Sequence, residues 1–225
     1  MSTTSPKKTT SPVIRLATPA DRDNVIAALT AGFSDDVIIS GWLISDPDTY
    51  AHYASGYFSC YTDYALEHGY VLTTGDETGA HINMPFQAWQ RAQQDTGLKD
   101  RLIETTGPFF EKVYELDEAL AKRHPTSPDH LYLCYTGVAP GHRDKKIGTQ
   151  LLQAAFDIAD RLQVPCYGEA SCERNARLYD RIGLFVQDDY IWLPGAETGI
   201  SPLWRPQSSV TILESDAEEL SNSEL

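Results

Sequence analysis

Residues 130–149 read HLYLCYTGVAPGHRDKKIGT, and this stretch decides the fold that we expect. Residues 130–138 are apolar and rich in β-formers, which predicts a strand. Ala139-Pro140-Gly141 ends the strand, and a turn rich in Arg, Lys and Gly leads into a predicted helix over residues 150–162. The N-terminus of a helix offers free backbone N–H groups and a partial positive charge. This turn is therefore suited to an anionic pyrophosphate.

The chain continues with a second strand and a short helix. PCYGEAS at residues 165–171 predicts the strand, and ERNARLYDRIG at residues 173–183 predicts a helix that carries Tyr179. Residues 186–193 and 200–204 then predict two final strands, joined by a loop that contains Pro and Gly.

Upstream of this region, predicted strands and helices alternate. Residues 13–17 predict a strand, and residues 19–33 and 46–68 predict helices. A hairpin of two strands and two further helices follow, over residues 70–74, 80–86, 87–94 and 108–123. This order of elements predicts an α/β (α+β) fold with a mixed sheet flanked by helices.

The second helix carries five tyrosines at spacings of three and four, so their side chains share one stripe. Packing in the core is the favoured interpretation. The amphipathic phenol also allows the alternative that the stripe lines an aromatic substrate pocket. The tyrosines are Tyr50, Tyr53, Tyr57, Tyr61 and Tyr64.

Composition limits the classes of partner. The 225 residues carry a net charge of −14, which disfavours nucleic acid as a partner because phosphate binding needs a basic face. The acidic balance suits a cationic amine but also simply aids solubility. We expect one domain over residues 13–206, a flexible tail over 1–12 and an acidic tail over 207–225.

Cysteine spacing and hydropathy limit the location. The four cysteines lack the close paired spacing of a zinc site, so no metal is expected. We find no signal peptide and no run of about 18 apolar residues, which predicts no membrane partner and a cytoplasmic location with free thiols.

The turn and the elements around it resemble a known family. Residues 137–152 resemble the acetyl-CoA-binding motif of the GNAT superfamily of N-acetyltransferases, which reads Arg/Gln, two residues, Gly, one residue, Gly/Ala. Arg143 takes the first place and Gly148 the last, whereas Lys146 stands where the first Gly is usual. Within the superfamily the chain is most similar to the puromycin N-acetyltransferase group, over residues 14–18, 138–140 and 164–165, at Glu169 and Arg174-Asn175, and at Tyr179.

The resemblance implies a mostly antiparallel sheet in which a splayed pair of parallel strands holds CoA, with acetyl-CoA as the co-substrate. Backbone N–H groups of the turn would point at the pyrophosphate, and the Val138 N–H is a candidate oxyanion donor or pantetheine contact. The side chain of Lys146 either crowds the phosphates or pairs with them. The implied cofactor-binding residues are Val138, Arg143, Asp144, Lys145, Lys146, Ile147, Gly148, Thr149 and Asn175.

Two residues are candidates for catalysis. A phenol with a pKa of about 10 is a competent acid for a departing thiolate, and by resemblance Tyr179 lies over the sulfur. Glu169 would orient the amine or relay its proton. The alternatives are a packing role for Tyr179 and a surface position for Glu169.

Candidate substrate residues lie near the end of the first long helix and on the predicted strand over residues 130–138. Asp36, with Asp35, would hold a cationic amine, although a capping turn is the favoured interpretation of this pair. Phe33 and Tyr135 complete the substrate set, and an ordinary strand role is the alternative for Tyr135.

The function that we expect is acetyl-CoA-dependent N-acetylation of a small amine, such as an aminonucleoside, an amine-bearing antibiotic or a metabolite. Transfer would occur by direct attack in a ternary complex, because no base is evident beside Cys134 or Cys166. One alternative is an acyl-CoA-binding or sensing module with weak or no transfer, and another is a protein or peptide acetyltransferase. The sequence does not fix the oligomeric state and leaves a homodimer open.

Overall fold

The computed structural model describes residues 13–143, 145–187 and 189–208. The expected tails therefore lie outside the described residues, apart from Gln207 and Ser208, and so does Asp144. No helix in the described part is both long and apolar enough to cross a membrane.

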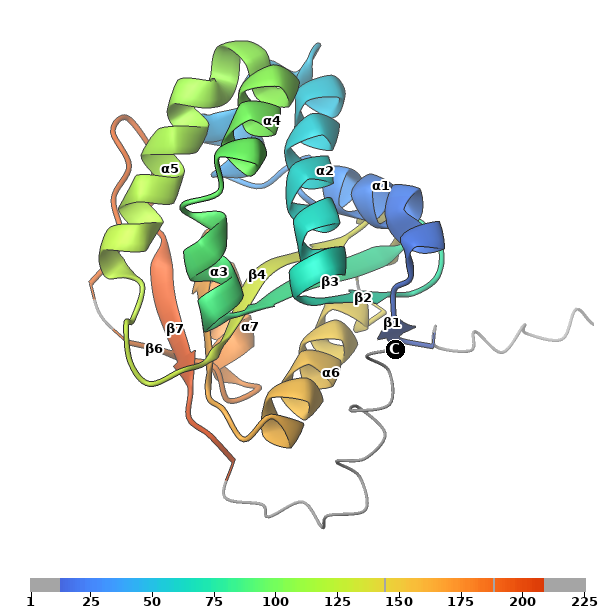
Figure 1. The fold of residues 1–225 in the computed structure, drawn as a ribbon, viewed down its shortest axis with the longest axis vertical. Helices are drawn as coiled ribbons and strands as arrows, with labels where there is room; N and C mark the ends of the chain where they lie inside the picture. The colour runs from blue at the N-terminus through green and yellow to red at the C-terminus, as the bar shows by residue number, and fades with distance from the viewer. Residues whose placement is uncertain (1–12, 144, 188, 209–225) are drawn as a thin grey trace, which may run out of the picture.

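Seven strands form one sheet in the order β1-β2-β3-β4-β5-β7-β6 (Figure 1). β4 and β5 run parallel, and the other neighbouring strands are antiparallel. This topology confirms the expected fold class. The strands are β1 Arg15–Leu16, β2 Tyr70–Thr73, β3 Gly79–Pro85, β4 Leu131–Val138, β5 Cys166–Ala170, β6 Phe185–Val186 and β7 Ser201–Arg205.

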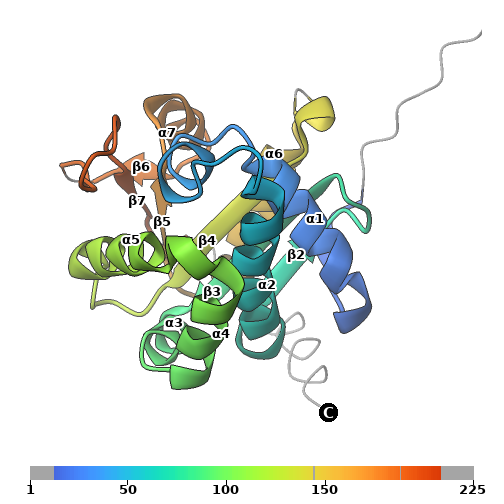
Figure 2. The same ribbon diagram turned by 90° about the horizontal axis from the view of Figure 1, so that it is seen from above.

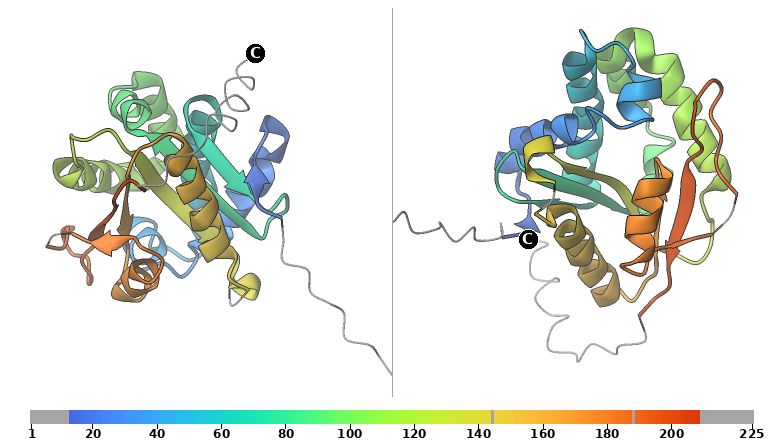
Figure 3. Two further views of the ribbon diagram at one scale, coloured as in Figure 1. Left: turned by 90° about the horizontal axis from the view of Figure 1, so that it is seen from below. Right: turned by 180° about the vertical axis from the view of Figure 1, so that it is seen from behind.

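Helices cover both faces of the sheet (Figures 2 and 3). One apolar cluster packs the first five α-helices against one face, and a second cluster packs the last two against the other. The first group comprises α1 Arg22–Gly32, α2 Tyr50–His68, α3 Phe86–Ala92, α4 Thr96–Thr106 and α5 Phe110–Arg123. The second comprises α6 Ile147–Arg161 and α7 Glu173–Asp180, and the short helices are η1 Pro19–Asp21, η2 Ile39–Leu43, η3 Gly107–Phe109 and η4 Pro140–His142.

A bulge in β4 opens the sheet. Ile82 of β3 pairs with Tyr135 and Asn83 pairs with Leu133, so Cys134 has no partner across the ladder. An extra residue of this kind bends its strand and increases the local twist. Within the described residues, β5 pairs with β4 no further than Leu133. The two parallel strands therefore part at Cys134.

A close approach of two backbones places the end of α1 beside β4. A Cβ atom on Gly32 would lie 2.6 Å from the Val138 nitrogen, and one on Gly137 would lie 3.0 Å from the Leu29 Cα. Glycine at both positions lets α1 cross directly over the strand. The segment that follows α1 is thereby held above the opening between β4 and β5.

Several predicted elements differ from the structure, and α2 begins at Tyr50 instead of residue 46. α4 was not predicted, because Gly97 and a mostly polar surface weaken its pattern and few of its side chains, such as Leu98 and Leu102, are buried. α6 begins at Ile147 instead of residue 150. The strand expected over residues 186–193 is reduced to Phe185–Val186 and a bridge from Ile191 to Ile200. The acidic residues between these two segments disfavour a strand.

The tyrosine stripe of α2 is mainly a core feature. Tyr50, Tyr57, Tyr61 and Tyr64 are buried, and Tyr53 packs against the same cluster. Core packing, the favoured interpretation, is therefore confirmed for these four side chains. Tyr57 nevertheless reaches β4 through a hydrogen bond to Tyr135.

Candidate active site

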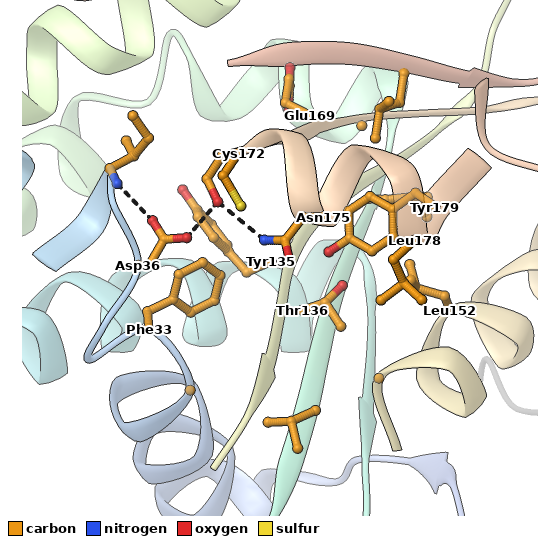
Figure 4. Close-up of a pocket in the computed structure, with 18 of the residues that line it drawn as sticks. Phe33, Asp36, Tyr135, Thr136, Leu152, Glu169, Cys172, Asn175, Leu178 and Tyr179 are labelled. Carbon is orange, nitrogen blue, oxygen red and sulfur yellow. Dashed lines mark hydrogen bonds between the residues drawn. The ribbon is translucent and has the colours of Figure 1, made fainter. Parts of the chain in front are cut away.

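A cavity of about 530 Å³ opens where β4 and β5 part. The start of α6 and the helix α7 line one side of it, and the segment after α1 lines the other (Figure 4). The side chains that Figure 4 labels come from the segment between α1 and η2, from β4, α6 and α7, and from β5 and the residues just after it. Segments far apart in the sequence thus form one site.

The basic turn lies at the edge of this cavity, as the sequence predicts. Its members Arg143, Lys146, Ile147, Gly148 and Thr149 line the cavity. α6 is 15 residues long, and its first turn presents free N–H groups at this point. Lys145 also belongs to the turn, but it is exposed and does not line the cavity, and Asp144 lies outside the described residues.

Lys146 holds the backbone conformation that glycine normally supplies. It is the N-cap of α6, with φ 62° and ψ 17°, which is the left-handed region. This explains why the helix starts at Ile147: Lys146 makes the turn and the helix follows at once. A non-glycine residue in this region carries a cost of about 1 kcal/mol.

Lys146→Gly is expected to raise the free energy of unfolding by about 1 kcal/mol, because glycine adopts this conformation without strain. The corresponding rise in Tm is roughly 2–4 °C. Thermal and denaturant unfolding measure it. Lys145→Gly is the control. It removes the same charge from the neighbouring residue, and Lys145 is not among the residues with a positive φ. If both variants change the free energy of unfolding by the same amount, backbone strain at Lys146 is not the cause.

Arg143 links the turn to the end of α1. Its guanidinium donates to both carboxylate oxygens of Asp35 at 2.5 and 2.6 Å and to the Gly32 carbonyl at 3.0 Å. The hydrogen bonds and charge of Arg143 lower the pKa of the Asp35 carboxyl. Arg143 therefore fixes the turn against α1 in addition to lining the cavity.

Asp35→Asn is expected to tighten CoA binding about two- to fivefold at low salt, because the guanidinium of Arg143 is then free to face an anion. The pair is partly exposed, with 64% of the Asp35 side chain accessible, so stability should change by less than about 0.5 kcal/mol. Calorimetry at two salt concentrations measures the affinity. Weaker binding would show that CoA needs Arg143 in the orientation that Asp35 gives it.

Val138 presents its backbone to the gap between the strands. Ala139 donates its N–H to Thr78 on the β3 side, so the N–H of the preceding residue points to the opposite edge. The Val138 carbonyl faces the same way, since it accepts from Arg143 Nε at 3.4 Å. This edge of β4 is where the resemblance expects a pantetheine or oxyanion contact.

Tyr179 projects from α7 into the cavity (Figure 4). Burial, together with the charges of Asp36 and Cys172, raises the pKa of its phenol well above the usual value. The hydroxyl consequently stays protonated over the physiological range. Asn175, one turn earlier on the same helix, lines the cavity and donates to Ser171 at 3.4 Å.

Asp36 caps the backbone N–H groups that follow it and also lines the cavity. Its Oδ1 accepts from the N–H groups of Ile38 and Ile39 at 3.0 and 2.9 Å. Its Oδ2 accepts from the Ser171 hydroxyl at 2.5 Å, and Ser171 in turn accepts from Asn175. This chain, drawn dashed in Figure 4, ties the segment after α1 to the end of β5 and to α7.

Glu169 lies on β5 just past the point where the strands part, and its carboxyl is buried. Burial raises the pKa of this carboxyl to about 7, although hydrogen bonds from Tyr132 and Tyr167 act to lower it. Its Oε2 accepts from the Tyr132 hydroxyl at 2.8 Å. The surface position considered from the sequence is thus wrong for Glu169.

Phe33 and Tyr135 form an aromatic wall on the side of α1. Their ring centroids lie 6.1 Å apart with an edge-to-face angle of 80°. Phe33 also packs on Phe58 at 5.2 Å. The wall lies beside Asp36 in Figure 4, so the three predicted substrate residues come together.

The predicted set of site residues leaves out several that line the cavity, Thr136 among them. Thr136 lines the cavity, and its hydroxyl lies 2.6 Å from His81 Nδ1, while His81 Nε2 lies 2.6 Å from the Asn83 side-chain oxygen. Burial lowers the pKa of His81 to about 4, so it is neutral. Because Nε2 donates to Asn83, Nδ1 accepts from Thr136. The polar pair on adjacent strands was visible in the sequence, but its register was not.

Cysteine thiols and metal ligands are the remaining groups that could carry chemistry at the site. Cys134 and Cys172 line the cavity. Burial and the nearby Glu169 raise the pKa of the Cys134 thiol well above its usual value, which disfavours a thiolate nucleophile. Among residues 13–143, 145–187 and 189–208, no three His, Cys, Asp or Glu side chains gather where they would hold a metal ion.

A family model matches the part of the chain that builds this site. Residues 84–184 match the model of the acetyltransferase (GNAT) family. This segment contains β4, the basic turn, α6, β5 and α7, which are the elements that build the gap and the basic turn beside it.

Solved structures share the fold. A Corynebacterium glutamicum protein described as histone acetyltransferase HPA2 and related acetyltransferase is 24% identical, with a TM-score of 0.67 over 90% of this chain and 100% of that chain. The C-terminal condensation domain of Ebony, in complex with β-alanyl-dopamine, is 15% identical, with a TM-score of 0.60 over 86% and 98%. The PaiA N-acetyltransferase of Thermoplasma acidophilum, in complex with coenzyme A, is 11% identical, with a TM-score of 0.52 over 86% and 98%.

Proposed function

We propose that this chain, which has the GNAT fold and a GNAT acetyltransferase segment over residues 84–184, transfers the acetyl group of acetyl-CoA to a small amine. One observation carries the proposal. A protonated phenol, Tyr179, and a buried carboxyl, Glu169, line the same cavity, which opens between parted parallel strands beside the basic N-terminus of a long helix.

The residues present fit CoA. The first turn of α6 supplies free N–H groups, and Arg143 and Lys146 add positive charge at the rim of the cavity in a chain that is otherwise strongly acidic. The free edge of β4 at Val138 suits the amide groups of the pantetheine arm. The fold relative from Thermoplasma acidophilum was solved with coenzyme A, which supports this ligand.

The opposite half of the cavity suits the acceptor. Phe33 and Tyr135 offer aromatic surface, while Leu116, Leu120 and Ile200 add apolar lining. Asp36 brings negative charge for a cationic amine. A pocket of this size and lining favours a small molecule over a peptide. The Ebony domain in complex with β-alanyl-dopamine provides a fold relative with an amine-derived ligand.

Acetyl-CoA, when bound, supplies an activated thioester. Glu169 is the proton acceptor for the amine, since a carboxyl with a pKa of about 7 takes up a proton and releases it near neutral pH. Tyr179 holds the proton that goes to the departing sulfur. The Val138 N–H points into the gap, where it would donate to the bound thioester, and Asn175 would hold the cofactor from α7.

Calorimetric titration with acetyl-CoA and with CoA, combined with a thiol-release assay on a panel of amines that includes puromycin, tests the proposal. Binding with amine-dependent thiol release supports it, and an aminonucleoside among the active amines would support the puromycin-like class. Tight binding without release on any amine would favour an acyl-CoA-binding module. Absence of CoA binding would contradict both functions and leave only a shared fold.

A further inference from the structure

A link of three polar side chains joins the two sides of the cavity. Asp36 lies on the segment after α1, Ser171 follows the end of β5, and Asn175 is in the first turn of α7. All three line the cavity. The Ser171 hydroxyl donates to Asp36 Oδ2 at 2.5 Å, and Asn175 Nδ2 donates to Ser171 Oγ at 3.4 Å (Figure 4). The proposed transfer uses Asn175 for the cofactor and the charge of Asp36 for the amine, but it gives this link no role.

The carboxylate at one end of the link is itself held in place. Asp36 Oδ1 accepts from the N–H groups of Ile38 and Ile39 at 3.0 and 2.9 Å. Both of these residues are buried, so the carboxylate cannot turn without leaving two N–H groups unpaired. Oδ2 is therefore presented to Ser171 in a fixed position.

The direction of each hydrogen bond in the link follows from the groups that make it. A carboxylate only accepts, so Ser171 donates its single hydroxyl proton to Asp36. The length of this bond is typical of a charge-assisted O–H···O bond, the stronger kind. The Ser171 oxygen then has only lone pairs left. It accepts from the amide nitrogen of Asn175 and would repel the amide oxygen.

The link thereby gives the Asn175 amide one orientation. Nδ2 is directed at Ser171, which leaves Oδ1 as the acceptor that the amide offers to a ligand in the cavity. The pantetheine arm of CoA carries amide N–H groups, which are the donors that such an oxygen accepts. An amide turned the other way would meet these N–H groups with its own N–H donors.

We infer that Asp36 is a positioning residue for CoA: through Ser171 it holds the Asn175 amide with Nδ2 toward Ser171 and Oδ1 open to an N–H donor of the pantetheine arm. The inference rests on the proposed function, from which it takes CoA as the ligand, and it gives Asp36 a second role beside its charge. A residue on the acceptor side of the cavity thus organises a contact on the cofactor side.

Calorimetric titration of the full-length protein with CoA tests this role in two single variants and their combination. Ser171→Ala removes the link and keeps the charge of Asp36. Asp36→Asn keeps an oxygen for the N–H groups that follow it but presents an amide nitrogen to Ser171, whose proton is then free to turn to Asn175. Each single change should weaken CoA binding about fivefold, and the double variant should match the singles, because both act through one link.

A second combination separates positioning of the amide from a general loss of packing. Asn175→Ala removes the amide that the link orients, and it should weaken CoA binding about tenfold. Ser171→Ala, added to Asn175→Ala, should then change the affinity by less than about twofold, because no amide is left to orient. If Ser171→Ala has the same effect with and without Asn175, its effect does not pass through the amide and the inference is wrong.

Ser40→Ala is the matched control. The Ser40 hydroxyl donates at 2.8 Å to the main-chain carbonyl of Asp36 instead of to its carboxylate, and Ser40 does not line the cavity. The variant therefore removes a serine hydroxyl beside Asp36 and leaves the link intact. Its Kd for CoA should equal that of the wild type. An equal loss of affinity in Ser40→Ala and Ser171→Ala would show that any loosening of the segment weakens CoA binding, and it would overturn the inference.

Steady-state kinetics with the best amine of the panel separates this role from the charge of Asp36. Ser171→Ala should raise the KM for acetyl-CoA about fivefold and leave kcat and the KM for the amine within about twofold of the wild type. Asp36→Asn should raise the KM for the amine as well, because it also removes the negative charge. A rise in the KM for the amine alone in Ser171→Ala would assign the link to the acceptor and count against the inference.

Failure of the proposed function can be told apart from failure of this inference, because calorimetry with CoA needs no acceptor. If the wild type binds CoA but acetylates no amine, weaker binding in Ser171→Ala and Asp36→Asn, but not in Ser40→Ala, would support the inference without transfer. Unchanged affinity in folded Ser171→Ala and Asp36→Asn would overturn the inference and leave the proposed function standing. A wild type that binds no CoA would reject both.

Discussion

Replacement of Tyr179 by Phe should lower kcat by about 10²- to 10³-fold and leave the Kd for CoA within about twofold of the wild type. The phenol lines the cavity, and burial raises its pKa, so the oxygen still carries its proton at physiological pH when a thiolate departs. Phenylalanine keeps the ring and its packing against the sheet but has no proton to give. Thiol release measures kcat, and calorimetry measures the affinity.

A control and a contrary outcome make this prediction specific. Tyr114→Phe removes an exposed hydroxyl on α5 that donates to Glu118 outside the cavity, and it should leave kcat unchanged. If Tyr179→Phe instead weakens CoA binding while turnover of the bound complex stays the same, Tyr179 packs against the cofactor and is not the acid.

Glu169→Gln should lower kcat about 10²-fold at pH 8 and remove the rise in kcat that the wild type shows as the pH increases through about 7. Burial raises the pKa of this carboxyl to about 7, so the wild type gains its proton acceptor across that range. Near pH 5 both proteins lack a carboxylate here, and their rates should converge. A pH–rate profile of each protein measures the effect.

The stability of Glu169→Gln at pH 8 should increase, although its kcat decreases. The pKa of Glu169 is raised in the folded protein, so its contribution to stability is complete below its usual pKa and is lost as the pH rises through about 7. Gln carries no such loss, and Glu169→Gln should therefore melt higher than the wild type at pH 8. Glu173→Gln, on the exposed start of α7, is the control for both measurements. If Glu169→Gln keeps the kcat of the wild type, another group accepts the proton of the amine.

The basic turn and its two neighbouring elements could be predicted from the sequence. Apolar residues over 130–138, the stop at Ala139-Pro140-Gly141 and the basic residues before a helix are local features, and local features determine strands, turns and helix starts. The register of Asn175 and Tyr179 is equally local, because residues four apart lie on one face of a helix. The structure places both side chains in the cavity.

The environment of each acid could not be predicted, because burial depends on elements that are distant in the sequence. Glu169 is enclosed beside Tyr132 of the neighbouring strand, and the partly buried Asp117 lies against α2 and β4. The pKa of both carboxyls is raised by desolvation, which no spacing within one element encodes. α4 also escaped prediction, since so few of its side chains are apolar and buried.

The sequence by itself determined the order of most elements, the basic turn and the identity of the groups able to hold a proton. The tertiary structure alone decided where the site opens. The bulge at Cys134 parts β4 from β5, and the close approach of Gly32 to Val138 sets α1 and Asp36 above the gap. Both depend on which residues face each other across the sheet and between layers, and this register is set by packing of the whole core.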